Sequence, residues 1–111
     1  MTYVRFTCTR QKGILNMIIS FLDKETEKIF HQRFSNKLPV TIQKVALRKL
    51  VMLDNASSLS DLRVPPSNRL EKLLGEHSNR WSIRINNQWR ICFVPISGGK
   101  DYAEVTTIDY H

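Results

Sequence analysis

Residues 81–93 read Trp-Ser-Ile-Arg-Ile-Asn-Asn-Gln-Trp-Arg-Ile-Cys-Phe, and this stretch decides the fold. Apolar and polar residues alternate over 81–85 and again over 89–93, which is typical of half-buried β-strands. The Asn-Asn-Gln between them is rich in residues that favour turns. We therefore predict an antiparallel hairpin whose turn is centred on Asn87.

The alternation also predicts the register of this hairpin. The apolar residues of both strands share one face only if paired positions sum to an even number, which sets Ile83 opposite Ile91 and Arg84 opposite Arg90. Like charges opposed across a ladder are destabilising. Guanidinium groups bind phosphate oxygens bidentately, so we interpret the arginine pair, on the face away from the core, as a phosphate-binding element. The alternative is neutralisation by a carboxylate of a neighbouring segment: Glu71, Glu104 or Asp109.

Upstream of the hairpin the pattern becomes helical. Asp23 is a suitable N-cap for a helix over about residues 23–34. Thr41 can cap a second helix over about 42–55, whose apolar residues recur along one face. Three cations are expected on the solvated side of this second helix: Lys44, Arg48 and Lys49.

The remaining segments complete a fold class. Residues 17–22, 68–74 and 102–110 are predicted strands, and 57–62 is turn-like, with one short helical turn at most. Trp81 and Trp89 are expected in the core. The order of one strand, two helices and about four strands predicts an α+β domain, with two N-terminal helices packed on one face of a small, mainly antiparallel sheet.

Composition limits the function classes. The 111 residues carry 17 Lys and Arg against 10 Asp and Glu, so the net charge is +7. Such a charge favours a polyanionic partner such as RNA, although a merely cationic surface would give the same count. No apolar run reaches the roughly 18–20 residues of a membrane span. Two distant cysteines and three scattered histidines form no disulfide framework or zinc motif, which favours a reducing cytosol.

The N-terminus allows two interpretations. A basic stretch before the apolar residues 14–22 resembles a signal peptide, but no small-residue cleavage site follows. We therefore expect residues 1–16 to be an upstream extension, with Met17 as the natural start of a domain over residues 17–111.

The chain closes with Asp109, Tyr110 and His111, which are a carboxylate, a phenol and an imidazole. Beside an arginine pair, these groups predict acid–base chemistry on a phosphodiester, whereas alone they would be an ordinary polar chain end. RNA is the natural substrate because its own 2′-OH can attack the adjacent phosphate. That reaction needs a base, an acid and cations, but no metal ion.

Residues 81–93, with residues 17–21, 68–71, Gly75 and the closing Asp-Tyr-His, resemble the HigB-type toxins, the plasmid-maintenance branch of the RelE/ParE superfamily. The resemblance covers residues 17–111. It implies a RelE-like fold and a cytoplasmic endoribonuclease that cleaves translated mRNA in the ribosomal A site without a cofactor. It also implies a HigA-type helix-turn-helix antitoxin, through which alone the complex would contact operator DNA.

The resemblance also assigns site residues. Four match positions that the family uses in catalysis: Arg90, Asp109, Tyr110 and His111. A histidine and a lysine found in some members are replaced here by Glu71 and Leu74. Three cations are candidates for the RNA contacts that these would supply: Arg69, Lys72 and Arg84. His111 or Asp109 would act as the base, and His111 or Tyr110 as the acid.

Two other function classes remain open from the sequence. One is a ParE-like inhibitor that binds DNA gyrase and performs no chemistry, which the replaced histidine and lysine favour. The other is a plain RNA-binding module. Cleavage of mRNA in a purified translation system separates the first hypothesis from both.

Overall fold

The predicted hairpin forms the centre of the sheet. The computed structural model describes residues 17–74 and 79–109. In it, β3 (Trp81–Arg84) pairs antiparallel with β4 (Trp89–Ile96), and Arg84 lies opposite Arg90. The register that parity predicts is therefore confirmed, including Ile83 opposite Ile91.

Among the described residues, five strands make one sheet in the order β1-β5-β4-β3-β2. The outer strands β1 (Met17–Ile18) and β2 (Glu71–Lys72) are short, and β5 (Asp101–Asp109) is long. In the part of the chain that the structure describes, the β1–β5 pair is parallel and the other three pairs are antiparallel. The expected mainly antiparallel sheet is confirmed.

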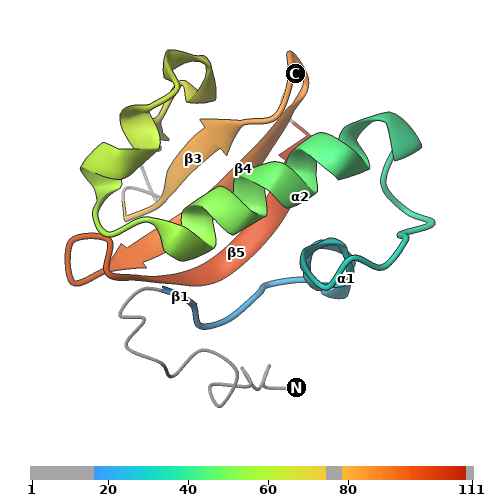
Figure 1. Cartoon of the computed structure of the whole chain (residues 1–111), viewed down its shortest axis with the longest axis horizontal. Helices are drawn as coiled ribbons and strands as arrows, with labels where there is room; N and C mark the ends of the chain where they lie inside the picture. Colours follow the sequence, from blue (N-terminus) through green and yellow to red (C-terminus); the bar gives the residue numbers. More distant parts are fainter. Residues whose placement is uncertain (1–16, 75–78, 110–111) are drawn as a thin grey trace.

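Two helices, α1 (Lys24–Phe30) and α2 (Val40–Asn55), precede most of the sheet. Figure 1 shows α2 lying across β4 and β5, with α1 beside it. The core lies between α2 and the sheet and consists of fully buried apolar side chains, among them Ala46, Leu50, Leu53, Ile83, Ile91 and Phe93. Trp81 and Trp89 are partly buried against this core, as expected. In the described residues no helix is long and apolar enough to cross a membrane.

Helix α1 begins as predicted but ends early. The carboxylate of Asp23 accepts a hydrogen bond of 2.9 Å from the backbone N–H of Thr26, so Asp23 is the N-cap. The helix stops at Phe30 rather than residue 34, because Gln32 adopts a left-handed conformation with φ 63°. The N–H groups of Gln32 and Arg33 then donate back to the last turn, which closes the helix.

The start of α2 and one of its faces differ from the prediction. The helix begins at Val40 after Pro39, and no side chain caps it, so Thr41 lies inside the first turn instead of capping it. Lys49, expected on the solvated side, is only 6% exposed. Its stem packs inward because two short 3₁₀ helices, η2 (Leu59–Arg63) and η3 (Pro66–Asn68), follow α2 and supply a buried acceptor, Asn68.

The predicted strand over 68–74 is shorter than expected. Asn68 belongs to η3, and Arg69 has φ 45°, in the left-handed region rather than the β region, so pairing is limited to Glu71 and Lys72. The 3₁₀ helix η2 matches the short helical turn expected over 57–62. The end of the last predicted strand, at Tyr110, lies outside the described residues.

Candidate active site

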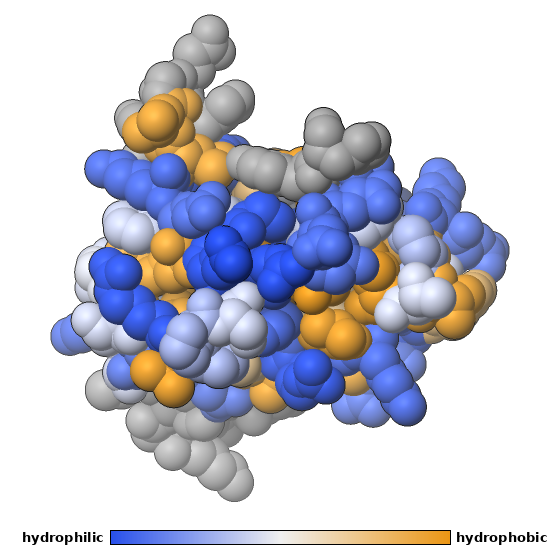
Figure 2. All heavy atoms as spheres, turned by 90° about the horizontal axis from the view of Figure 1, so that it is seen from above, coloured by the Kyte–Doolittle hydropathy of each residue, from blue (hydrophilic) through white to orange (hydrophobic). Residues whose placement is uncertain are grey.

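Six polar side chains line a cavity of about 340 Å³ beside the turn that joins β3 and β4, and we call it the arginine cavity: Arg69, Glu71, Arg84, Asn86, Asn87 and Arg90. Figure 2 looks down on the end of the molecule where this turn lies, and hydrophilic side chains gather across the centre of that face. Among residues 17–74 and 79–109, three guanidinium groups and one carboxylate therefore surround this cavity.

Arg90 is the fixed member of the three. Its side chain extends from β4 on the face away from the core, as parity predicts, but it is only 7% exposed instead of solvated. The Nε donates to Ser82 Oγ at 2.8 Å, and an Nη donates to the carbonyl oxygen of Arg69 at 2.5 Å. These bonds orient the guanidinium group before any ligand arrives.

Arg84 and Arg69 are the accessible members. Arg84 donates to the carbonyl oxygen of Asn86 at 3.1 Å and to Asn87 Oδ1, so the turn itself holds this side chain. Arg69 is exposed, and within the described residues its side chain forms no hydrogen bond or ion pair. Both arginines retain donors that can turn to a phosphate oxygen.

One of the three alternative carboxylates lies beside the arginine pair. Glu71 Oε1 is 3.8 Å from an Nη of Arg90, because Glu71 pairs with Ser82 and shares its face of the sheet. Glu104 instead forms an ion pair with Arg80. Three arginines against one glutamate leave the cavity cationic.

The other predicted site residues lie apart from this cavity or outside the described residues. Lys72 pairs with Trp81, so its side chain leaves β2 on the face opposite Arg90. Asp109 pairs with Trp89, also on that opposite face, and it accepts a hydrogen bond of 3.1 Å from Gln88. Tyr110 and His111 are not among the described residues.

A buried thiol lies behind the cavity. Cys92 pairs with Ser82 and is fully buried on the same face as Arg90. Burial raises the pKa of Cys92 to about 11, although the nearby charges of Arg90 and Arg80 act in the opposite direction. A protonated thiol at neutral pH is inert, so Cys92 serves as packing.

Sequence reasoning missed the residues that support the arginines. Asn86 and Asn87 were treated as turn formers, yet they form one wall of the cavity. Ser82 orients Arg90, and Asn68 anchors the segment that carries Arg69. The signal for Ser82 in the sequence is its position: it is a polar residue two positions before Arg84, on the same face of a half-buried strand. In the part of the chain that the structure describes, no group of three or more His, Cys, Asp or Glu could hold a metal ion.

Comparisons with known proteins fit this architecture. A family model described as the RelE-like toxin of type II toxin-antitoxin system HigB matches residues 19–111. Toxin HigB-1 of Vibrio cholerae is 40% identical over 83 residues, which are 74% of this chain and 87% of that protein. An uncharacterised protein of Haemophilus influenzae is 40% identical over 58 residues, which are 52% of this chain and 57% of that protein. On the extent of the family match and the identity to Toxin HigB-1, this chain belongs to the HigB-like family of RelE-like toxins of type II toxin-antitoxin systems.

Proposed function

We propose that this toxin is an endoribonuclease that cleaves translated mRNA in the ribosomal A site without a metal ion or other cofactor. The observation that carries the proposal is the convergence of three arginines on one cavity in a chain of the HigB-like family. A fixed cationic cavity stabilises a phosphate group most when negative charge on that group increases, as it does during cleavage.

In the proposed reaction the 2′-OH of the RNA attacks the adjacent phosphorus. The bond between phosphorus and the 5′-oxygen breaks, which leaves a 2′,3′-cyclic phosphate and a free 5′-OH. Arg90, already oriented by Ser82, would bind the non-bridging oxygens, and Arg84 and Arg69 would close over them. Lys72, outside the cavity, would contact the RNA backbone.

Two proton transfers accompany this step. His111 or Asp109 would take the proton of the 2′-OH, and His111 or Tyr110 would give one to the leaving 5′-oxygen. A free imidazole titrates near pH 6.5 and suits either role, whereas a free tyrosine, near 10, needs a lowered pKa.

The proposed partners follow from the same family. The ribosome would present the mRNA, and a HigA-type helix-turn-helix antitoxin would neutralise the toxin. The complex would contact operator DNA only through the antitoxin. We propose the cytoplasm as the place of action because translating ribosomes are found there.

Arg84→Ala tests the cavity without disturbing a buried group. Loss of one cationic stabiliser lowers the rate of such reactions by about 10²–10³-fold. Single-turnover cleavage on programmed ribosomes should fall by that factor, while Arg48→Ala, an exposed cation on α2, should leave the rate unchanged. Circular dichroism should show both variants folded. Wild-type cleavage by a folded Arg84→Ala variant would remove Arg84 from the mechanism.

Deletion of His111 tests the proton transfers. General acid–base groups contribute about 10²–10⁴-fold, so cleavage should fall at least about a hundredfold while thermal stability persists. Near-normal cleavage by the folded deletion variant would exclude His111, and the base would then be sought at Asp109 or Glu71.

The same assays separate the alternative functions. Inhibition of DNA gyrase without mRNA cleavage would select the ParE-like inhibitor. RNA binding without cleavage or gyrase inhibition would select a plain RNA-binding module.

We also propose that residues 1–16 are dispensable and that residues 17–111 form the toxin domain. The family match begins at residue 19, which supports this boundary. A chain lacking residues 1–16 should retain toxicity and melting temperature, and a large drop in either would contradict the proposal.

A further inference from the structure

A second cavity, of about 210 Å³, lies between α1 and α2 and shares no residue with the arginine cavity. We call it the α1–α2 groove. Ile29 lies at its base, since this side chain is almost fully buried, and Leu47 of α2 adds a second apolar side chain. The groove is therefore apolar inside, and its upper edge is formed by Phe34 and by polar residues of α2 and of the segment that follows α1.

Phe34 is 62% exposed although the backbone around it is fixed. On one side, the N–H of Arg33 donates to the carbonyl of Lys28 at 2.8 Å. On the other side, buried Ser35 donates through its Oγ to Glu25 of α1, and its backbone exchanges two hydrogen bonds with the side chain of Gln43 of α2. The exposed ring therefore sits on a rigid segment, which is the property of a preformed anchor at an interface.

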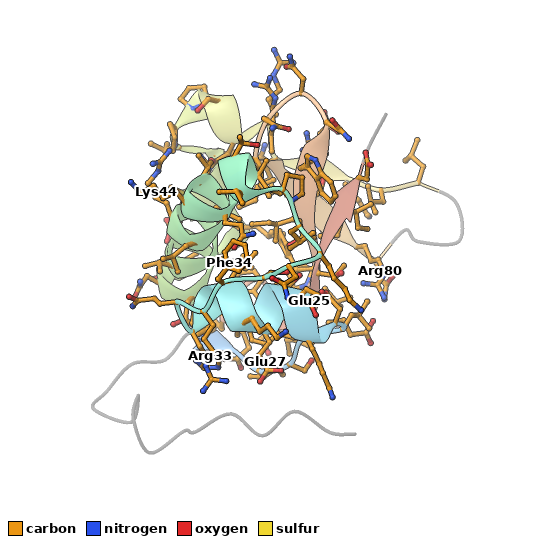
Figure 3. The ribbon with its side chains drawn as sticks, turned by 90° about the vertical axis from the view of Figure 1, so that its right-hand side faces the viewer. Glu25, Glu27, Arg33, Phe34, Lys44 and Arg80 are labelled. Atoms are coloured by element: carbon orange, nitrogen blue, oxygen red, sulfur yellow. The ribbon has the colours of Figure 1, made fainter. Side chains whose placement is uncertain are left out.

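The edge of the groove is cationic. Arg33 and Lys44 both line it, and neither makes an ion pair with another described residue. Figure 3 shows Phe34 between the two helices, with Arg33 and Lys44 to one side of it and the acidic Glu25 and Glu27 to the other. Glu25 already has a cationic partner, since its Oε2 lies 3.5 Å from Nζ of Lys28. Oε2 of Glu27 lies 4.0 Å from Nε2 of His31, which is an ion pair only when the imidazole is protonated.

We propose that the α1–α2 groove is the docking site of the antitoxin, through an acidic segment that inserts an apolar side chain beside Phe34. The charge of the edge selects this occupant, because Arg33 and Lys44, which have no ion-pair partner among the described residues, attract carboxylates and repel a cationic surface. A partner protein is available by family, since a type II toxin is paired with an antitoxin. The proposal rests on family membership and on the groove, and does not depend on the cleavage reaction.

Calorimetry with the purified cognate antitoxin tests the apolar contact. Phe34→Ala should weaken binding at least about thirtyfold, because buried aromatic anchors supply much of the free energy of binding at interfaces. Val64→Ala is the matched control, since Val64 is 70% exposed and lies on the η2 side of the molecule. It should bind as the wild type does.

Kinetics test the charged contact. The double variant Arg33→Glu and Lys44→Glu should slow association at least about tenfold at low salt and reduce its salt dependence. Lys100→Glu, an exposed cation after β4, should change neither quantity measurably. Phe34→Ala should keep wild-type cleavage on programmed ribosomes, and Arg84→Ala should keep wild-type antitoxin affinity, so the two proposals fail independently.

Three outcomes would overturn the inference. Wild-type affinity of both groove variants would remove the antitoxin from this groove. Loss of antitoxin binding in Arg84→Glu, with the groove variants unaffected, would place it at the arginine cavity instead. A toxin homodimer in sedimentation that Phe34→Ala dissociates, with antitoxin affinity unchanged, would make the occupant a second copy of this chain.

Discussion

The Nζ of Lys49 on α2 donates a hydrogen bond of 2.5 Å to Oδ1 of Asn68 in η3, and both side chains are buried. Asn68 in turn donates through Nδ2 to the carbonyl oxygen of Leu62 at 3.0 Å. The next residue, Arg69, accepts a hydrogen bond from Arg90 through its own carbonyl oxygen. A buried polar chain thus connects α2 to the guanidinium group at the base of the arginine cavity.

Asn68→Ala should destabilise the fold by about 3 kcal/mol, because it leaves the buried ammonium group of Lys49 without this acceptor. Burial, with a smaller effect of nearby Arg48, already lowers the pKa of Lys49. Urea denaturation measures the loss. Adding Lys49→Met to Asn68→Ala should recover much of it, since no buried charge then remains.

Asn36→Ala is the control for this cycle, because Asn36 is exposed and surface substitutions usually change stability by less than about 0.5 kcal/mol. If Asn68→Ala is no more destabilising than Asn36→Ala, the Lys49–Asn68 bond does not hold η3 in place.

The Arg90→Ala variant should have a lower free energy of unfolding than the Arg84→Ala variant. Arg90 is buried and bonded to Ser82 and Arg69, so its removal leaves buried polar groups unpaired and should cost about 3 kcal/mol. Arg84 bonds only to its own turn among the described residues and should cost less than about 1 kcal/mol. Guanidine denaturation of both variants gives the comparison, and equal losses would contradict the buried role of Arg90.

Alternation in the sequence predicts the hairpin register and the pairing of Arg84 with Arg90, because the period of two is a local property of extended chain. It cannot predict that Arg90 is buried. That depends on η3 and β2 covering the outer face, and their path depends on a left-handed Arg69 and on buried Asn68. The pattern likewise predicts Lys49 in solvent, because its acceptor, Asn68, lies 19 residues away in the sequence and is not visible to a local pattern.

Tyr102→Phe should stabilise the protein by about 1 kcal/mol. The ring of Tyr102 packs edge-on against Phe93 with centroids 5.3 Å apart, and this contact survives the change. The hydroxyl is buried with no hydrogen-bond partner among the described residues, so its loss removes a desolvation penalty. Thermal unfolding measures the gain, and a fall in melting temperature would indicate a partner for this hydroxyl.

Gly99→Ala tests how closely the chain packs around the hydroxyl of Tyr102. An added Cβ would lie 2.8 Å from the hydroxyl oxygen of Tyr102 and 2.6 Å from the backbone nitrogen of Leu59, at a residue with φ 102°. The substitution should lower the melting temperature. In the Tyr102→Phe background the loss should be smaller, because the close contact with the hydroxyl oxygen is gone while those with the backbone of Ser58 and Leu59 remain.

Stability should fall as the pH rises from 9 to 11, and Cys92 should account for part of the fall. The pKa of Cys92 is raised by burial from 9.0 to about 11, so the unfolded chain loses this proton while the folded chain keeps it. The folded state then binds more protons, and the free energy of unfolding decreases with pH, by up to about 3 kcal/mol between pH 9 and pH 11. Below pH 9 the thiol is protonated in both states and has no effect.

Two other buried groups modify this slope. Burial also raises the pKa of Tyr102, to about 12, so Tyr102 adds a fall of the same sign above pH 10. The pKa of Lys49 is lowered, so the unfolded chain binds the extra proton and Lys49 acts in the opposite direction. Urea midpoints at pH 8, 9 and 10 should therefore be compared between Tyr102→Phe and the double variant Tyr102→Phe and Cys92→Ala. The double variant should start less stable but show a clearly flatter decline, and equal slopes would show that the Cys92 thiolate is tolerated in the fold.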